Sequence, residues 1–296
     1  MANKKTSVHY YIMLLPGLIW LVLFSIVPMF GIAMAFQNFN PARGVFGSEF
    51  VGLEHFRFMF LIRDVRRALS NTVIISVSKI VFHLFVPLVF ALMLNELKGA
   101  FFRRSVQTIT YLPHFISWVI LSVMILDLFS NTGPVNQILN ALGGDSVLFF
   151  ARPDLFRSFV VASDVWKEMG FRAIIFLAAL TGINPELHEA AAMDGAGRLK
   201  RLWHITLPGI KTTAVLLATL SLSNVLNAGF DQVFNLYNPV VYATGDIIDT
   251  WVYRAGLLNL QFSLATAVGL LRSVVGFFLI AISYLLASKF AGYRIF

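Results

Sequence analysis

Residues 11–36 of the chain read YIMLLPGLIWLVLFSIVPMFGIAMAF, and no Asp, Glu, Lys or Arg occurs between Lys5 and Arg43. A helix needs about 20 consecutive apolar residues to cross the hydrocarbon core of a bilayer, so this stretch is long enough to do so. The apolar region of a secretory signal peptide is shorter, at roughly 7–15 residues, and this stretch also contains Pro16 and Pro28. We therefore interpret it as an uncleaved first membrane span.

The composition of the whole chain also fits a membrane protein. Of the 296 residues, 58% are apolar and 13% are charged, and the mean hydropathy is +0.77. A soluble domain is about 45–50% apolar and about 25% charged, so this chain has too few charges to cover a water-facing surface. A soluble enzyme, a disordered chain and a nucleic-acid-binding domain are therefore poor interpretations. Cysteine is absent, which excludes disulfides and thiolate metal sites.

Five further apolar stretches follow, and together they predict an all-α polytopic membrane protein. The six predicted transmembrane helices cover residues 11–36, 69–94, 105–128, 158–180, 212–231 and 262–288. The fourth is the most polar, because it contains Asp164, Lys167, Glu168 and Arg172, and hydropathy alone is a weak argument for it. An even number of spans places both termini on the same side of the membrane.

The distribution of Lys and Arg favours a cytoplasmic location for both termini. The side with the two termini, residues 95–104 and residues 181–211 has 11 basic residues, whereas the other side has 8 over more loop residues. Because cytoplasmic loops are enriched in Lys and Arg, the first side is predicted to be cytoplasmic.

Residues 181–211, TGINPELHEAAAMDGAGRLKRLWHITLPGIK, form the loop with the clearest pattern. Pro185 marks a helix start, and residues 186–193 are strong helix formers. Glu189 and Asp194 lie near the turns, where their side chains can cap backbone N–H groups.

The second half of this loop predicts a turn and another helix. Gly195 and Gly197 interrupt the first helix, and a second short helix is expected over residues 198–206, ending before Pro208. The residues alone fit either of two structures. One is a compact helix–glycine–helix elbow whose small side chains let another surface approach closely, and the other is an amphipathic helix that lies on the membrane surface.

The spacing within this loop resembles a family motif. Glu189-Ala190-Ala191 is followed after three residues by Gly195, and after nine more by Ile205-x-Leu207-Pro208. This pattern resembles the EAA loop of permease subunits in binding-protein-dependent ABC importers. Segments similar to the maltose-type sugar branch of that family are Asn71-Thr72, Phe101-Phe102-Arg103, Tyr111-Leu112-Pro113, Ala178–Leu180 and Ile183-Asn184-Pro185. Within that branch, the chain is most similar to permeases for complex, often acidic oligosaccharides such as alginate.

The resemblance implies a fold and a function. It implies the type I ABC importer permease fold, with a five-helix core and one peripheral N-terminal helix, in a single domain over residues 1–296. The chain is then expected to carry oligosaccharides, such as alginate or other uronate oligomers, across the inner membrane of a bacterium. The expected partners are a second permease subunit, two ATPase subunits docked on residues 181–208, an extracytoplasmic solute-binding protein and membrane lipid, but no nucleic acid.

Motifs for catalysis are absent from the chain. No GxxxxGK[ST] or HExxH pattern occurs, and the six His are scattered, so neither a catalytic residue nor a metal site nor a cofactor is predicted. ATP and magnesium are expected on the partner ATPase. One alternative is a permease of the same superfamily for an amino acid or phosphate. Alternatives of another class are a membrane-embedded enzyme, which would need clustered His and acids, and a stand-alone secondary transporter, which would not need an ATPase-coupling loop.

The resemblance assigns the coupling role to residues of the 181–208 loop. In importers of this family, the EAA loop forms a coupling helix that sits in a groove of the ATPase. The residues expected to take part are Glu189, Ala190, Ala191, Asp194, Gly195, Ile205, Leu207 and Pro208. Arg198 and Arg201 either pair with acidic residues of the ATPase or belong to the ordinary basic surplus of a cytoplasmic loop.

The fifth span carries a polar stripe that suits a substrate pathway. Ser221, Asn224, Asn227 and Asp231 are spaced by 3, 3 and 4 residues, which predicts one face of a helix. Polar groups inside a membrane span usually face a cavity or a partner helix. The stripe is thus expected either to contact sugar or to form hydrogen bonds with the partner permease.

Charged and aromatic side chains within other spans are further pathway candidates. Trp166, Lys167 and Arg172 lie in the fourth span, and Arg272 lies in the sixth. Arg172 is expected either to pair with Glu168 one turn away or to attract an anionic sugar. A buried Arg272 needs a counter-charge, for which Asp164, Asp127 and a substrate carboxylate are candidates. These three cations and Lys79 lie inside spans, which makes an acidic oligosaccharide worth testing.

Overall fold

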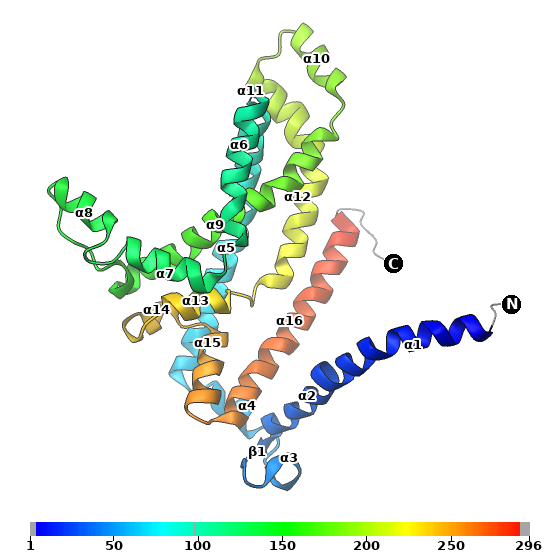
Figure 1. Ribbon diagram of the computed structural model, residues 1–296, viewed down its shortest axis with the longest axis vertical. Coiled ribbons are helices and arrows are strands. Elements are labelled where there is room, and N and C mark those ends of the chain that lie inside the picture. The colour runs from blue at the N-terminus through cyan, green and yellow to red at the C-terminus, as the bar shows by residue number, and fades with distance from the viewer. Residues whose placement is uncertain (1–3, 98, 291–296) are drawn as a thin grey trace. The chain divides into compact units, whose positions relative to one another are not determined.

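The computed structural model describes residues 4–97 and 99–290, and its regular structure is almost entirely helical (Figure 1). The prediction of an all-helical protein is confirmed, since the strands in the described part of the chain have two residues each. The chain divides into two compact units. Among the described residues, the first unit consists of 4–65 and 251–271, and the second of 66–97, 99–250 and 272–290. The termini, predicted to be cytoplasmic, lie outside the described residues.

In the first unit, an N-terminal helical segment leads into a small hairpin and a short helix. Its elements are α1 (Lys4–Leu21), the π turn η1 (Val22–Ile26), α2 (Val27–Met29), the 3-10 helix η2 (Phe30–Phe36), β1 (Gln37–Asn38), α3 (Gly44–Gly47), β2 (Glu49–Phe50), α4 (Glu54–Met59) and the π turn η8 (Arg254–Leu258). Strands β1 and β2 pair antiparallel. Residues of α5 (Arg63–Asn95), α15 (Ile248–Tyr253) and α16 (Phe262–Phe290) belong partly to this unit and partly to the second.

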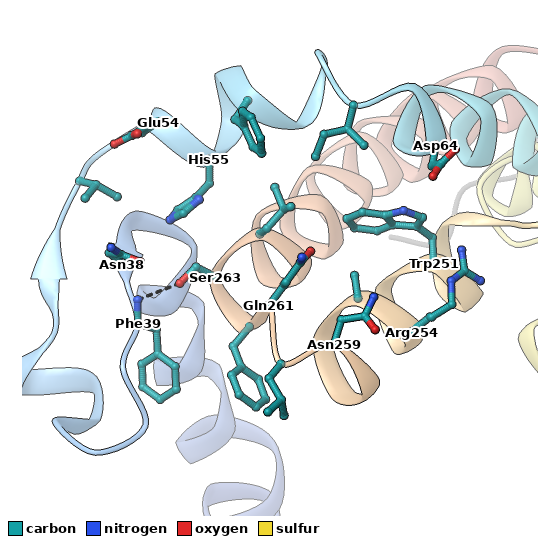
Figure 2. A pocket seen from close by; sticks show the side chains of 17 residues that line it. Asn38, Phe39, Glu54, His55, Asp64, Trp251, Arg254, Asn259, Gln261 and Ser263 are labelled. Atoms are coloured by element: carbon teal, nitrogen blue, oxygen red, sulfur yellow. Dashed lines mark hydrogen bonds between the residues drawn. The ribbon is translucent and has the colours of Figure 1, made fainter.

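The first unit contains a cavity of about 710 Å³ (Figure 2). The hairpin is tied to the start of α16, because the Phe39 N–H donates to the Ser263 hydroxyl (2.9 Å) and the Phe39 ring meets Phe262 edge-on. Nε2 of His55, in α4, lies 3.1 Å from the Gln37 carbonyl oxygen. Packed elements of a single unit therefore line the cavity, which is open to one side.

The second unit is built around the long helix α9. Its remaining elements are α6 (Ala100–Tyr111), η3 (Leu112–Phe115), α7 (Trp118–Leu128), α8 (Pro134–Ala141), η4 (Phe149–Ala151), α9 (Pro153–Thr181), α10 (Pro185–Met193), α11 (Arg198–Arg201), the π turn η5 (Leu202–Thr206), α12 (Leu207–Ser221), η6 (Leu222–Asn224), α13 (Phe230–Leu236), η7 (Pro239–Val241) and α14 (Tyr242–Gly245). One apolar core joins α5, α7, α9 and α13 through Ile75, Leu121, Val160 and Val233.

Helices α6 and α9 approach each other closely at Gly170. A Cβ atom at this position would lie 2.3 Å from the carbonyl oxygen of Thr110, which is far inside van der Waals contact. Small residues allow this kind of close helix crossing in membrane proteins. The crossing brings the polar middle of α9 next to η3.

Length and composition identify four helices that can cross a membrane: Tyr10–Phe36, Arg63–Asn95, Arg198–Asn224 and Phe262–Lys289. A fifth is possible if the bent pair Ala100–Phe115 and Trp118–Leu128 forms one span. Helix α9, the predicted fourth span, has 29 residues but is not among these helices, because the charged residues in its middle make it too polar. The count of six spans therefore stays a prediction.

The predicted third span, residues 105–128, is not one straight helix. The chain bends by 105° between Phe115 and Trp118. Pro113 lies in the 3-10 turn η3, Ile116 is extended, and the Ser117 side chain caps α7 by accepting a hydrogen bond from the Ile120 N–H. A proline ends one helix and a serine N-cap starts the next. The predicted span therefore contains two helices, which its apolar composition alone does not distinguish.

The Asn71-Thr72 pair fastens α5 to the segment before α15. The Asn71 amide donates to the Asp246 carbonyl (2.9 Å), and its oxygen accepts a hydrogen bond from Arg157 (2.6 Å). The Thr72 hydroxyl accepts from the Ile248 N–H (2.9 Å). Buried polar groups that are satisfied in this way fix helix packing, which is a structural role for this motif.

Candidate functional site

The 181–208 loop forms a helix–glycine–helix elbow. Helix α10 begins at Pro185, and the Asn184 side chain caps it by accepting a hydrogen bond from the Glu186 N–H (3.0 Å). The turn after α10 contains Gly195 at φ +77°, a conformation that residues with a Cβ rarely adopt. Helix α11 then starts at Arg198. Of the two structures that the residues fit, the elbow is the one observed.

Two details of the predicted elbow are wrong. The cap of α10 is Asn184 rather than Glu189 or Asp194, neither of which makes a side-chain hydrogen bond within the described residues. The second helix does not end before Pro208, since α11, η5, α12 and η6 form one run from Arg198 to Asn224. The π turn η5 comes directly before Leu207-Pro208, and such a local widening lets a helix pass a residue that lacks an N–H.

The elbow presents apolar side chains that the sequence reasoning missed. Four large apolar residues on it are exposed: Leu187, Met193, Leu199 and Trp203. Met193, at the end of α10, is 89% exposed. Exposed apolar side chains beside charged ones are typical of protein interaction sites. The signal in the sequence was the presence of Met and Trp in a loop with many charges.

A polar pocket of about 330 Å³ lies elsewhere in the second unit, between α5, α9 and the end of α12. Its lining residues are Ser76, Lys79, Ile80, His83, Asp164, Glu168, Arg172, Ser221, Asn224, Asn227 and Gly229. The continuous 27-residue run that starts at the elbow ends at Asn224. The elbow and the wall of the pocket therefore belong to the same helical rod, about 40 Å long at 1.5 Å per residue.

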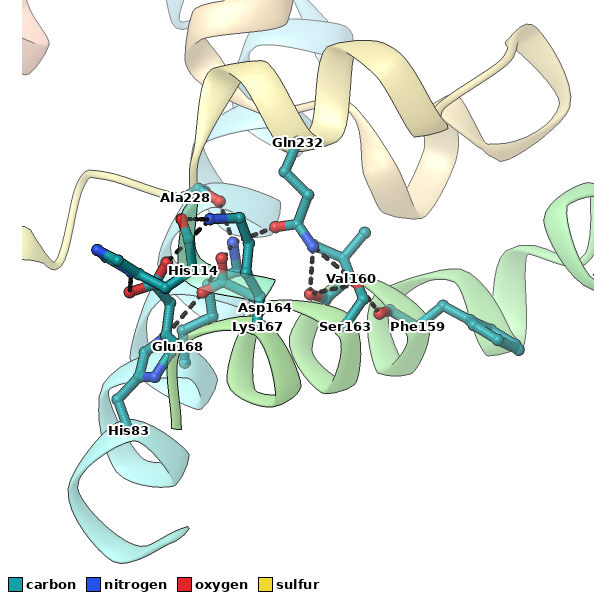
Figure 3. Close-up of polar contacts among 11 residues, drawn as sticks. His83, His114, Phe159, Val160, Ser163, Asp164, Lys167, Glu168, Ala228 and Gln232 are labelled. Atoms are coloured by element: carbon teal, nitrogen blue, oxygen red, sulfur yellow. Dashed lines mark hydrogen bonds and ion pairs between the residues drawn. The ribbon is translucent and has the colours of Figure 1, made fainter. Parts of the chain in front are cut away.

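A buried ionic network forms one side of this pocket (Figure 3). Oδ2 of Asp164 lies 2.7 Å from Nε2 of His83 and 3.5 Å from Nζ of Lys79. The Lys79 ammonium also donates to the Ala228 carbonyl (2.8 Å) and to the Gln232 side-chain oxygen. The Gln232 amide in turn donates to α9. Helices α5, α9 and α13 are thus joined by charges that lipid cannot solvate.

A second polar group ties α9 to η3. The Lys167 ammonium donates to the His114 carbonyl (2.7 Å) and lies 3.3 Å from a Glu168 oxygen. The other Glu168 oxygen is 2.9 Å from Nδ1 of His114, whose ring stacks on Phe171 at 3.9 Å. Lys167 is buried and does not line the pocket, so it serves packing in this arrangement rather than contact with a substrate.

Arg172 is the charged residue of the pocket that has no direct bonding partner within the described residues. It is exposed and lines the pocket, and no hydrogen bond or ion pair to it occurs within the described residues. The expected intrahelical pair with Glu168 does not form, because Glu168 is held by His114 and Lys167. An exposed guanidinium in a pocket can bind carboxylate or phosphate oxygens.

The prediction of a polar stripe on the fifth span is only partly correct. Ser221, Asn224 and Asn227 line the pocket, and Asp231 does not. The assumed single helix is wrong, because the helical run ends at Asn224 and Gly229 adopts φ +88° before α13 begins. The loop brings Asn227 into the pocket and carries Asp231 away on another helix.

Two of the other pathway candidates lie away from this pocket. Trp166 lines a separate cavity of about 530 Å³ on another face of α9. Arg272 pairs with Asp249 (2.7 Å) and donates from Nε to the Leu226 carbonyl (3.0 Å). Its partner is therefore Asp249 and neither Asp164 nor Asp127, which corrects the candidates that the sequence offered.

Two polar residues on α5 complete the pocket and were missed by the sequence reasoning. Ser76 Oγ and His83 Nδ1 are buried, and neither has a hydrogen-bond partner within the described residues. Buried polar atoms without partners are rare in proteins, and both residues belong to the wall of the pocket. Their spacing with Lys79, three and four residues, marks one helix face and was the available signal.

Comparison with known proteins identifies the family of the chain. Residues 83–292 match the family described as "Binding-protein-dependent transport system inner membrane component". This region contains α9, the elbow and α12, and all of the polar pocket apart from Ser76, Lys79 and Ile80.

Individual proteins are similar over nearly the whole length. The polygalacturonan/rhamnogalacturonan transport system permease protein YteP of Bacillus subtilis (strain 168) is 42% identical over 95% of this chain and 88% of its own. A crystal structure of a bacterial ABC transporter involved in the import of the acidic polysaccharide alginate has a chain that is 37% identical, with a TM-score of 0.87 and 97% of each chain covered. A second structure shows the bacterial alginate transporter in complex with an alginate pentasaccharide-bound periplasmic protein, at 36% identity, a TM-score of 0.87 and 98% coverage of each chain.

Proposed function

Because the chain belongs to the family of binding-protein-dependent transport system inner membrane components, we propose how its elbow and its polar pocket work together in an importer of oligosaccharides. The chain is a multi-pass protein of the inner membrane and the permease of an ABC transporter, whose ATP is hydrolysed on separate subunits. It works with a binding protein. YteP and both similar structures are described as transporters of polysaccharides or their fragments. This similarity favours an oligosaccharide, over an amino acid or phosphate, as the substrate of this chain.

The observation that carries the proposal is the rod from Arg198 to Asn224, which starts in the elbow and ends in the pocket wall. Two ATPase subunits dock on the elbows of this chain and of a second permease, with ATP and magnesium bound to the ATPases. The exposed apolar residues Met193 and Trp203 suit a groove on the ATPase. When the ATPases close, they displace the elbow, and the rod transmits that displacement to Ser221 and Asn224.

The orientation follows from this docking. The ATPases hydrolyse cytoplasmic ATP, so the elbow is cytoplasmic, as the basic residues Arg198 and Arg201 also favour. With six spans, both termini are then cytoplasmic, and residues 37–62 and 251–261 face the extracytoplasmic side, where the binding protein delivers substrate. Arg198 and Arg201 are exposed or half-buried and can pair with acids of the ATPase.

The substrate passes through the polar pocket. Ser221, Asn224 and Asn227 offer hydrogen bonds to sugar hydroxyls, together with the unpaired atoms of Ser76 and His83. Arg172 is exposed in this pocket and forms no direct ion pair or hydrogen bond within the described residues, so its guanidinium can bind the carboxylates of a uronate oligomer such as an alginate or polygalacturonate fragment. Trp166, Lys167, Asp231 and Arg272 act outside this pocket.

Coupling is tested with two glutamates of the same helix. In proteoliposomes that contain the assembled importer and its binding protein, Glu189→Gln should lower ATP-driven uptake and the co-isolation of the ATPase. Glu186→Gln is the matched control, since Glu186 is exposed on α10 but lies outside the EAA pattern. Uptake by the chain without an ATPase, or equal effects of the two substitutions, would refute the coupling role.

The preference for acidic sugar is tested at Arg172. A charge-assisted hydrogen bond contributes about 1.5–3 kcal/mol, so Arg172→Gln should lower uptake of trigalacturonate about 10–100-fold. Uptake of a neutral trisaccharide should change little, and Arg103→Gln, at an exposed arginine of α6, is the control. An equal loss for both sugars would assign Arg172 to the structure of the pocket instead.

A further inference from the structure

The cavity of the first unit has no role in the mechanism above. Its volume, about 710 Å³, is in the range of small-molecule sites, which is about 300–1,000 Å³. It is lined by aromatic side chains that include Phe39, Phe58 and Trp251, and by the amides of Asn38, Asn259 and Gln261. Its carboxylates are Glu54 and Asp64, and its guanidinium is Arg254.

The amides of this cavity are available to a ligand. Asn38, Asn259 and Gln261 are exposed, and their side chains make no hydrogen bond within the described residues. Each amide has both donors and acceptors, which is the combination that sugar hydroxyls need because they also donate and accept. The phosphodiester oxygens of a phospholipid, in contrast, only accept hydrogen bonds at neutral pH.

The backbone that carries two of these amides is strained and hydrogen-bonded. Leu260, between them, adopts φ +57°, which is uncommon for a residue with a Cβ. The turn is held by hydrogen bonds from the Asn259 N–H to the Arg254 carbonyl (3.0 Å) and from the Gln261 N–H to the Ala255 carbonyl (2.9 Å). The π turn η8 leads into it, and π turns are frequent at functional sites. The backbone at Asn259 and Gln261 is thus fixed by hydrogen bonds, while both side-chain amides stay available to a ligand.

The size and charge of the cavity limit the class of ligand that it can bind. Figure 2 shows Asn38 and Glu54 at one end and Asp64 and Arg254 at the other, with Gln261 between them in the view. A cavity of about 710 Å³ is large enough for a short chain of sugar units. The Glu54 carboxylate is exposed, lines the cavity and forms no ion pair within the described residues. It repels an anion, so a phospholipid phosphate and a uronate are both disfavoured relative to an uncharged sugar.

We propose that this cavity is a second saccharide site, specific for neutral sugar units and separate from the polar pocket. The inference rests on the proposed function, because it takes the substrate to be a saccharide and residues 37–62 and 251–261 to be extracytoplasmic. Neutral units or branches of an incoming oligosaccharide are held by the amides at this site. The polar pocket with Arg172 receives the uronate units.

The test measures direct binding to the assembled importer in nanodiscs without the binding protein. The importer carries Arg172→Gln, which removes the cation that the polar pocket offers to an acidic sugar. In this background, isothermal titration with galactotriose and with trigalacturonate compares a neutral and an acidic probe at the cavity of the first unit. Galactotriose should bind more tightly, and the Asn259→Ala/Gln261→Ala double substitution should weaken it about tenfold, as expected for two lost hydrogen bonds. Asn131→Ala, at an exposed asparagine outside the cavity, should leave binding unchanged. Glu54→Gln should reduce the difference in affinity between galactotriose and trigalacturonate.

Three outcomes would overturn this inference. In the first, the double variant binds galactotriose with unchanged affinity. In the second, the cavity binds trigalacturonate more tightly than galactotriose. In the third, galactotriose does not bind, and a phospholipid copurifies with the importer but not with the double variant. Failure of the proposed function looks different. An importer that binds galactotriose at this cavity but transports no saccharide would refute the function and leave the site, whereas normal uptake without galactotriose binding would refute the site alone.

Discussion

Removing the Lys79 ammonium should destabilise the second unit more than removing a surface lysine. Lys79 is 6% exposed, and its ammonium contacts Asp164, the Ala228 carbonyl and the Gln232 side chain. Lys79→Met keeps a side chain of similar length and deletes only the charge and the donors. It leaves the Asp164 carboxylate with His83 as its remaining partner in the network.

The size of the effect follows from these contacts. Breaking a buried ion pair by removing one partner costs about 3–5 kcal/mol, and each buried acceptor left without a donor costs about 1–3 kcal/mol. His83 still bonds Asp164 at 2.7 Å, and the pocket admits solvent to the carboxylate, so the total belongs near the lower limit. We expect Lys79→Met to lower the free energy of unfolding by about 3 kcal/mol.

A double-mutant cycle isolates the ion pair from the other contacts. The free energy of unfolding is measured in detergent by denaturant titration, with tryptophan fluorescence as the signal. Lys79→Met/Asp164→Asn should be more stable than the sum of the single effects by about 1–3 kcal/mol. The control is Lys211→Met, at an exposed lysine. If Lys79→Met is no worse than this control, or if the two single effects simply add, the network does not hold the helices together.

Three further predictions concern glycines and an ion pair. Gly170→Ala places a Cβ 2.3 Å from a carbonyl of α6 and should reduce the monodisperse fraction in size-exclusion chromatography; an unchanged profile would contradict the close crossing. Arg272→Gln should cost about 1–3 kcal/mol and Asp249→Asn a similar amount, with partial recovery in the double variant; strict additivity would argue against their pairing. Gly195→Ala forces φ +77° on a Cβ-bearing residue, a strain of about 1 kcal/mol, and should weaken ATPase co-isolation, whereas Gly197→Ala, at φ −67°, should not.

The class of fold and the elbow could be read from the sequence because both have local causes. An apolar run long enough to cross a bilayer, such as residues 11–36, can be recognised from its own sequence, without knowledge of the segments that pack against it. The elbow depends on the order asparagine, proline, helix formers and glycine, and each step acts on the next few residues. Pro208 misled the sequence reasoning because a π turn one step earlier relieves the clash that normally ends a helix.

The polar pocket was only partly predictable, because its parts are distant in the sequence. Ser221 and Asn224 were found from their spacing, but the same spacing wrongly extended the helix past Gly229. The pairing of His83 with Asp164 joins residues 81 positions apart, and helical periodicity carries no information about such a pair. Ser76, Lys79 and His83 lie on one face of α5, and this pattern gains its meaning only when α9 lies beside it.

The charges of α9 have a consequence for how the chain is made. On insertion scales, each Asp, Lys or Arg near the middle of a helix opposes entry into the membrane by about 2.5–3.5 kcal/mol, and α9 carries three such residues and Glu168. As the ribosome proceeds, α5 and η3 are synthesised before α9, so Lys79, His83 and His114 are in place when Asp164 and Glu168 emerge. If α9 is the fourth span, as the sequence predicts, its entry into the bilayer is expected to be a cooperative step that depends on helices already inserted. The order of the elements along the chain would then contribute to assembly.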